Sequence, residues 1–167
     1  FLERLTPLRR RESLPLAARF AHCPEPAPIA ERERLSYRPI AEGEVWGAAW
    51  ESGWFHLTGE VPAAWTGERV AAWIDLGGEG LVTDAAGRIL QGVSSGSIWL
   101  GDFQRELVPL FERCAGGERG ELWVEGAASS LFGVHTELDP APGAPRSLIH
   151  PQPPGAAPVN GCVWRCW

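Results

Sequence analysis

Apolar and polar residues alternate with a period of two along the middle of the chain, which is the pattern of strands that bury one face. In the segment 54–61, Phe55 and Leu57 fall on one face of the expected strand. Trp54 and His56 fall on the opposite face. The alternation therefore predicts a strand whose two faces meet different surroundings, with His56 held by a hydrogen-bond partner.

Five further segments have the same short, apolar-polar pattern and are predicted strands. They span residues 69–75, 79–83, 88–92, 106–110 and 121–125. The tetrapeptide 84–87, DAAG, has the composition of a hairpin turn. Pro109 cannot donate a backbone hydrogen bond, so its strand is expected at a sheet edge. With a last strand over 131–138, the chain is predicted to be an all-β sandwich or barrel.

The first residues of the chain follow a helical period instead. Apolar side chains recur there at Phe1, Leu2, Leu5 and Leu8. We therefore predict an N-terminal helical segment over residues 1–22, interrupted near Pro7. Such a helix either docks on another domain or packs on its own sandwich, and the sequence leaves both possibilities open.

Two Pro-rich segments flank the predicted sandwich domain, which spans residues 37–139. Alternating prolines favour extended geometry in residues 23–36, so this segment is expected to be a connector laid over the surface. Residues 140–167 are rich in Pro, Gly and Ala without a sustained period. We expect these residues to form an irregular C-terminal tail.

Composition narrows the class of protein. At 167 residues, with 44% hydrophobic and 22% charged residues, the chain can bury one sizeable core. Its net charge of −6 argues against nucleic acid as a partner. No apolar run approaches the ~20 residues of a membrane span, and no secretory signal is seen. The four cysteines are irregularly spaced, which indicates reduced thiols and a cytoplasmic protein.

The sequence offers few candidates for catalysis or metal binding. No pair has metal-ligand spacing among the histidines, which are His22, His56, His135 and His150. Cys162 and Cys166 have no second ligand pair. Asp75, Glu79 and Asp84 could in principle supply a glycosidase carboxylate pair, but turn capping explains Asp84, and Asp75 and Glu79 flank a Gly-Gly turn, so structural roles are favoured. Because nucleophile-elbow, phosphate-loop and dinucleotide motifs are absent as well, we expect no catalytic residue, metal site or cofactor in this sequence.

Four groups of residues follow one another in an order that one enzyme family shares. They are FLER at 1–4 with RRRESLPL at 9–16, GEVWG at 43–47 with WF at 54–55, GEGLV at 78–82, and LWVEGAA at 122–128 with LFG at 131–133. In these groups the chain resembles the N-terminal β-sandwich domain of family 38 glycoside hydrolases, the α-mannosidases of the bacterial and fungal-vacuolar branch. Four motifs in the right order are more specific than any one of them.

The resemblance implies a jelly-roll-like antiparallel β-sandwich in front of a catalytic (β/α) barrel. The family's barrel holds a zinc ion through His and Asp residues and uses a nucleophilic Asp for retaining hydrolysis of α-mannosides. Residues 147–167 contain neither the family's helical linker nor its His-x-His-x-Asp motif. The catalytic parts are therefore expected outside this sequence, through truncation, a gene fragment or a frameshift near Arg146.

The nine tryptophans are the one feature that is compatible with a function other than catalysis, because sugars stack their apolar C–H face on exposed aromatic rings. Large aromatics also dominate core and interface burial. That structural role is expected for Trp50, Trp54, Trp73 and Trp123. The residues nearest loops, and hence the candidate carbohydrate-binding residues, are Trp46, Trp65 and Trp99.

Three functions remain open from the sequence. The first is a non-catalytic domain that scaffolds the barrel of an α-mannosidase, with zinc in the barrel and subunit neighbours in a homo-oligomer. The second is a carbohydrate-binding module for mannose-type sugars. The third is a stand-alone interaction domain, and an exposed apolar patch with self-association would favour the first function over it.

Overall fold

The computed structural model describes residues 12–48, 51–94, 105–128 and 161–166, and the elements below lie within them. The strands are β1 (Glu12–Pro15), β2 (Ala17–Cys23), β3 (Arg38–Pro39), β4 (Ser52–Glu60), β5 (Val70–Asp75), β6 (Glu79–Asp84), β7 (Ile89–Ser94), β8 (Leu107–Phe111), β9 (Arg119–Ala127) and β10 (Gly161–Cys166). Two short 3-10 helices are η2 (Ile29–Arg34) and η3 (Ala63–Trp65).

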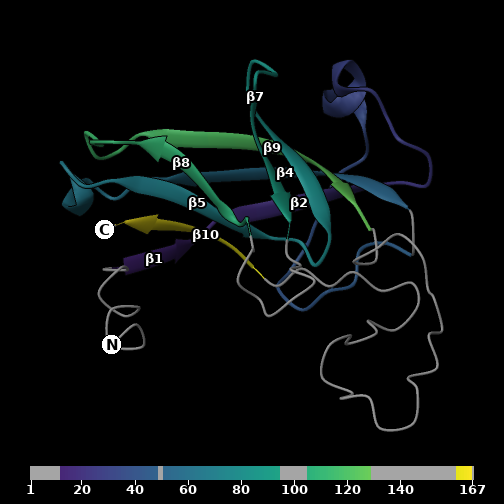
Figure 1. The fold of residues 1–167 in the computed structure, drawn as a ribbon, viewed down its shortest axis with the longest axis horizontal. Coiled ribbons are helices and arrows are strands. Elements are labelled where there is room, and N and C mark those ends of the chain that lie inside the picture. The colour runs from purple at the N-terminus through teal and green to yellow at the C-terminus, as the bar shows by residue number, and fades with distance from the viewer. Residues whose placement is uncertain (1–11, 49–50, 95–104, 129–160, 167) are drawn as a thin grey trace, which may run out of the picture.

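These strands form two antiparallel sheets, packed as a sandwich (Figure 1). The six-stranded sheet has the order β3-β2-β4-β9-β6-β7, and the four-stranded sheet has the order β1-β10-β5-β8. Many neighbours in a sheet are far apart in the sequence, as when β4 pairs with β9 and β5 with β10. The prediction of an all-β antiparallel sandwich is confirmed.

The core lies between the sheets and is built from residues that the alternation grouped on shared strand faces. Phe55 and Leu57 of β4 are 0% exposed. Val124 and Leu122 of β9 are their cross-strand partners and are buried with them. The four-stranded sheet contributes the alternate residues from Val70 to Ile74. Burying each large apolar side chain contributes roughly 1.5–3 kcal/mol, so this layer is a main source of stability.

Local turn chemistry also follows the sequence. The backbone N–H of Arg88 donates to Asp84 Oδ1 at 2.9 Å, which closes the hairpin between β6 and β7. Gly87 has a φ of 80°, a conformation that favours glycine. Pro109 lies in β8, which is an edge strand of the four-stranded sheet as predicted. Asp75 Oδ1 accepts a hydrogen bond from the N–H of Gly77 at 3.0 Å, a structural role consistent with its place at a turn.

A second apolar cluster covers the outer face of the six-stranded sheet. Its buried members are Ala21, Cys23, Trp54 and Trp123. The segment 24–37, here called the strap, lies over them and packs Ala27, Leu35 and Tyr37 against the cluster. The indole N–H of Trp54 donates to the carbonyl of Ala27 at 2.9 Å. The Pro-rich connector predicted over 23–36 thus includes η2 and is bound to the sheet.

One arginine fastens the strap. Arg32 of η2 is buried, and its guanidinium carbon lies 5.2 Å from the ring centroid of Trp123. Its Nη1 donates to the carbonyl of Ile29 at 2.9 Å, and its Nη2 donates to that of Ala85 at 2.8 Å. The hydroxyl of Tyr37 donates to the carbonyl of Arg32 at 2.8 Å. A buried charge needs such partners, and these tie η2 to the β6–β7 hairpin.

The predicted N-terminal helix is wrong for residues 12–22, which form β1 and most of β2. The strands follow an alternation in which Leu14, Leu16, Ala18 and Phe20 occupy every second position. Leu16 and Phe20 are buried in the core. The helical spacing lies mainly in residues 1–11, which are outside the described residues.

The predicted irregular tail is wrong for residues 161–166, because they form β10 in the interior of the four-stranded sheet. Cys166 pairs with Glu12 of β1, and Cys162 pairs with Ile74 of β5. The short apolar end of the chain carries no period of its own, and its partners lie far away in the sequence. Residues 140–160 and the strand predicted over 131–138 lie outside the described residues.

Candidate functional site

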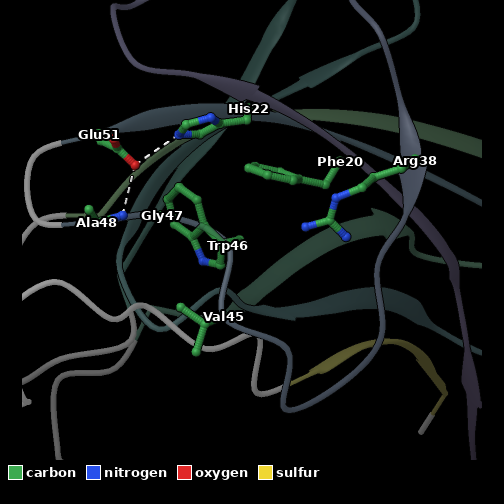
Figure 2. Close-up of a pocket in the computed structure, with 8 residues that line it drawn as sticks. All are labelled: Phe20, His22, Arg38, Val45, Trp46, Gly47, Ala48 and Glu51. Carbon is green, nitrogen blue, oxygen red and sulfur yellow. Dashed lines mark hydrogen bonds and ion pairs between the residues drawn. The ribbon is translucent and has the colours of Figure 1, made fainter.

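A shallow pocket of about 400 Å³ lies at one end of the sandwich, between β2 and the segment that joins β3 to β4 (Figure 2). Its lining residues are Phe20, His22, Arg38, Val45, Trp46, Gly47, Ala48 and Glu51. Phe20 and His22 come from β2, which alternates toward and away from the core, and Arg38 comes from β3. Pockets of this size hold small ligands when polar groups converge on an apolar lining.

Aromatic rings form the inner wall of the pocket. Phe20 is 1% exposed and Trp46 is 4% exposed, with their ring centroids 5.7 Å apart in an edge-on contact. Trp46 also contacts Phe55 edge-on at 5.0 Å, and its indole N–H donates to the carbonyl of Leu76 at 2.7 Å. These contacts fix the wall, and Val45, which is 52% exposed, adds a side chain at the mouth.

His22 and Glu51 form one polar side of the pocket. Glu51 Oε2 lies 2.8 Å from His22 Nε2 and also accepts a hydrogen bond from the backbone N–H of Ala48 at 2.8 Å. The Ala48 hydrogen bond, followed by that of His22, holds the pKa of Glu51 below its usual value. Glu51 is therefore an ionised acceptor at neutral pH, held in a fixed orientation.

Arg38 forms the opposite polar side. Its guanidinium carbon lies 5.5 Å from the ring centroid of Phe20. Its Nη1 donates to the carbonyl of Pro39 at 3.2 Å and pairs with Glu44 Oε1. A hydrogen bond from the N–H of Ala41 to Glu44 Oε2, and then the Arg38 pair, lower the pKa of Glu44. The pocket thus has a cation on one side and a carboxylate on the other.

This arrangement suits binding better than catalysis. Glu51 is the one carboxylate among the residues that line the pocket. Glycoside hydrolysis uses two carboxyl groups that flank the scissile bond. Sequence reasoning did not single out Arg38 or Glu51, because His22, Arg38 and Glu51 come together through strand pairing and carry no common local motif.

The structure corrects the expected exposure of the candidate tryptophans. Trp46 lines the pocket but is 4% exposed, and Trp65 is 3% exposed. The indole N–H of Trp65 donates to Glu12 Oε2 at 2.7 Å, and the thiol of Cys114 donates to its carbonyl at 2.7 Å. Both residues belong to the core between the sheets, so nearness to a loop in the sequence did not mean exposure. Trp99 lies outside the described residues.

The tryptophans with an expected structural role have two kinds of environment. Trp54 and Trp123 are buried, but beneath the strap and not between the sheets. Trp123 stacks on His56 with ring centroids 4.0 Å apart. His56 Nε2 lies 2.9 Å from Glu121 Oε1, which confirms the prediction that this histidine has a hydrogen-bond partner. Trp50 is outside the described residues.

Trp73 is different, because it is partly exposed on the outer face of the four-stranded sheet. The guanidinium carbon of Arg165 lies 4.2 Å from its ring centroid, and its indole N–H donates to Glu106 Oε2. Burial raises the pKa of Glu106. Leu107, the cross-strand partner of Trp73, is 44% exposed, and Pro109 beside it is exposed as well. We call the exposed surface of Trp73, Leu107 and Pro109 the bare face.

The described residues do not suit a zinc ion. Within them, no three His, Cys, Asp or Glu side chains are grouped so as to hold a metal. Cys23, Cys114 and Cys162 are free buried thiols, and burial raises the pKa of Cys162 to about 12.

No helix within the described ranges is long and apolar enough to cross a membrane.

Comparison with known proteins gives one consistent result. A family model described as "Alpha-mannosidase, jelly roll domain" matches residues 14–152. Alpha-mannosidase G of Dictyostelium discoideum is 32% identical over 101 residues, which are 60% of this chain and 9% of that protein. Alpha-mannosidase 2C1 of Homo sapiens is 31% identical over 115 residues, which are 66% of this chain and 10% of that protein.

A solved structure supports the fold. Ruminococcus gnavus beta-glucuronidase matches with a TM-score of 0.56 at 13% identity, over 93% of this chain and 27% of that one. At that identity the likeness concerns the fold alone. This chain spans about a tenth of the length of the two α-mannosidases it matches. The matched family model covers most of the antiparallel sandwich, and the chain belongs to the α-mannosidase jelly-roll domain family.

Proposed function

We propose that this chain is the non-catalytic N-terminal domain of an α-mannosidase and that it scaffolds the catalytic barrel of the same enzyme. The observation that carries the proposal is the family match over residues 14–152, together with the small share of each α-mannosidase that the chain spans. About nine-tenths of each relative lies outside the match, which leaves ample room for a catalytic domain.

The chemistry of the enzyme belongs to that other part under this proposal. The proposed reaction is the retaining hydrolysis of α-mannosides, and His and Asp residues of the barrel would hold a zinc ion that would supply positive charge at the sugar. The described residues of this chain do not suit that ion, so no step of the reaction is assigned to them. A cytoplasmic location and a homo-oligomeric state are further parts of the proposal.

The bare face is the surface proposed for contact with the barrel. Trp73 and Leu107 give it apolar area, and Arg165 and Glu106 hold the indole in a fixed orientation. Tryptophan and arginine are enriched among the residues that dominate binding energy at protein interfaces. The length of enzyme outside this chain supports the barrel as the occupant of this face.

An activity assay tests the first part of the proposal. The purified chain, with and without added zinc, is expected to leave an aryl α-mannoside intact. Turnover that copurifies with the folded chain contradicts a non-catalytic role. The complete enzyme, assayed in parallel, is expected to release the aryl group.

A protection experiment tests the scaffold. Leu107→Cys introduces an accessible thiol, whereas the thiols of Cys23, Cys114 and Cys162 are buried. Alkylation at this position is expected to be fast in the separate chain and slow in the complete enzyme. Ile89→Cys, on a residue that is 67% exposed on β7, is the matched control and is expected to react fast in both. Equal rates at position 107 contradict docking, and protection in a self-associated separate chain assigns the face to a second copy.

A further inference from the structure

We propose that the pocket between His22, Arg38 and Glu51 binds a neutral pyranoside unit of an oligosaccharide. The inference concerns a binding site and does not depend on which part of the enzyme is catalytic. It rests on the proposed function only for the choice of an α-mannoside as the first probe. The argument comes from the charges that face the pocket, from the atoms left available to a ligand, and from the apolar wall.

The opposed charges favour a neutral polar ligand. Glu51 is an ionised acceptor on one side, so an anion placed deep in the pocket is repelled. Arg38 lies on the other side, where its ion pair with Glu44 balances its charge, so this side does not favour a charged ligand either. A sugar hydroxyl donates one hydrogen bond and accepts others, so a ring that carries several hydroxyls can satisfy both sides at once.

Each polar side has atoms available for such a ligand. Glu51 uses Oε2 for His22 and Ala48, and no described residue donates to its Oε1. Arg38 uses Nη1 for Pro39 and Glu44, and no described residue accepts from its Nη2. Figure 2 shows the Arg38 guanidinium turned toward Phe20, across the pocket from Glu51. Both side chains are already held by protein contacts, which lowers the entropy cost of binding.

The inner wall suits the C–H groups of a sugar ring. Phe20 and Trp46 present small exposed areas, and Val45 presents more than half of its surface. A ring therefore contacts Val45 and the edges of the aromatic residues, without the face-on stacking expected from an exposed tryptophan. The volume of about 400 Å³ admits one or two pyranose rings. This geometry predicts weak binding that depends on the polar contacts.

The test is a titration of the full chain with methyl α-mannopyranoside and with an α-linked mannobiose, followed by two-dimensional NMR. The expected result is a saturable shift of the backbone amides of Val45 and Ala48 and of the Trp46 indole N–H at millimolar sugar. The acyclic polyol glucitol is expected to cause no saturable shift. The absence of shifts at these three groups, or equal shifts with glucitol, overturns the proposal.

Two variants locate the ligand. Arg38→Met keeps most of the side-chain stem and removes the donors, so the affinity is expected to fall about tenfold or more, as for lost hydrogen bonds to charged groups. Arg88→Met is the matched control, because Arg88 also pairs with a carboxylate but lies on the β6–β7 hairpin. An affinity that is equal in the wild type and in Arg38→Met overturns the assignment of the site.

A second pair of variants tests the same proposal in case Arg38→Met does not fold. Val45→Trp places a large side chain at the mouth of the pocket, at a residue that is 52% exposed. It is expected to abolish the shifts at Ala48, whereas Ile89→Trp on β7 is expected to preserve them. Unchanged binding in Val45→Trp overturns the proposal. If sugar binding fails while the chain remains inactive on aryl α-mannosides, the pocket proposal falls and the proposed function stands.

Discussion

The outer faces of the two sheets carry tryptophans in different environments. On the six-stranded sheet, Trp54 and Trp123 are 1% and 5% exposed because the strap packs over them. On the four-stranded sheet, Trp73 is partly exposed and its neighbour Leu107 is 44% exposed. The residue type is the same, and what lies over the sheet decides its exposure. A tryptophan on a strand can therefore be interpreted as a binding residue only when it is known whether another segment packs over that face of the sheet.

The different cover of the two outer faces also suggests that one face contributes mainly to stability and the other mainly to association. The chain's own strap covers the outer face of the six-stranded sheet, and Arg32 binds the strap to Trp123 and to the β6–β7 hairpin. On the outer face of the four-stranded sheet, Ala71 and Arg165 are buried, but the bare face keeps exposed apolar area at Trp73 and Leu107. Stability is therefore expected to depend strongly on the covered face, and association on the bare one. Four predictions test this division, beginning with the largest effect.

The largest effect is expected from removing β10, which lies between β1 and β5. Truncation after Asn160 leaves the backbone groups of both neighbours unpaired within the sheet. The loss is expected to exceed about 5 kcal/mol, the lower end of typical domain stability, so the chain should not fold. Far-ultraviolet circular dichroism and dispersion of the amide NMR spectrum provide the measurement. A native-like spectrum from the truncated chain would show that the bare face does not need β10.

The second prediction compares the two faces directly. Trp54→Ala removes a fully buried indole beneath the strap and is expected to cost about 3–5 kcal/mol. Trp73→Ala removes a partly exposed one and is expected to cost about 1 kcal/mol. Urea unfolding of both variants measures the difference. Equal losses would show that the two faces contribute alike to stability.

The third prediction concerns the fastening of the strap. Arg32→Met deletes the donors to Ile29 and Ala85 and is expected to cost about 2 kcal/mol. Hydrogen exchange of the Trp54 indole N–H should also become faster, since Ala27 in the strap accepts its hydrogen bond. Arg88→Met, at a largely exposed arginine, is the control and is expected to stay within about 0.5 kcal/mol of the wild type. Unchanged indole exchange in Arg32→Met would mean that other contacts hold the strap.

The smallest effect concerns one carboxyl group on each outer face. Burial raises the pKa of both Glu106, beside Trp73, and Glu125, opposite Trp54 in register. A raised folded-state pKa means that the folded protein binds the proton more tightly than the unfolded chain. Stability is therefore expected to fall as pH rises from the ordinary glutamate pKa through the raised one.

Glu106→Gln and Glu125→Gln should each flatten this dependence, measured as the urea midpoint across that pH window. In the complete enzyme, docking at the bare face should alter the Glu106→Gln effect and leave that of Glu125→Gln unchanged. A wild-type midpoint that rises with pH in this window, or variants that leave its slope unchanged, would argue against buried carboxyls at these positions.

Much of the fold could be predicted from alternation, and the misses have physical reasons. Period two grouped Phe55 with Leu57 and predicted the strand that carries Leu122 and Val124, and the composition at Asp84 predicted the hairpin. Alternation alone did not show that Phe55 faces the core while Trp54 lies beneath the strap. The alternation through Leu14 and Phe20 was present but was assigned to a helix that the first eight residues suggested. Local periodicity could not identify β10, because the bonds that order it come from β1 and β5.

The candidate site was harder to predict than the fold. Trp46 was singled out for its place near a loop, yet its importance in the pocket is as a buried wall held by Leu76. His22 and Glu51 are separated by 29 positions, and antiparallel pairing between β2 and β4 brings them together. A site assembled by strand pairing leaves no fixed spacing in the sequence.

The position of β10 has a consequence for how the domain is made. β1 pairs with β10, and Glu12 lies opposite Cys166 in this pairing. During synthesis β1 therefore has no partner in this pair until residues 161–166 have been made. During synthesis the strands β2, β4, β6, β7 and β9 can associate first, while the four-stranded sheet stays open. Closing contacts over such long sequence separations is slow and leaves strand edges exposed meanwhile. The nascent domain is therefore expected to keep the edges of β1 and β5 exposed until β10 emerges from the ribosome.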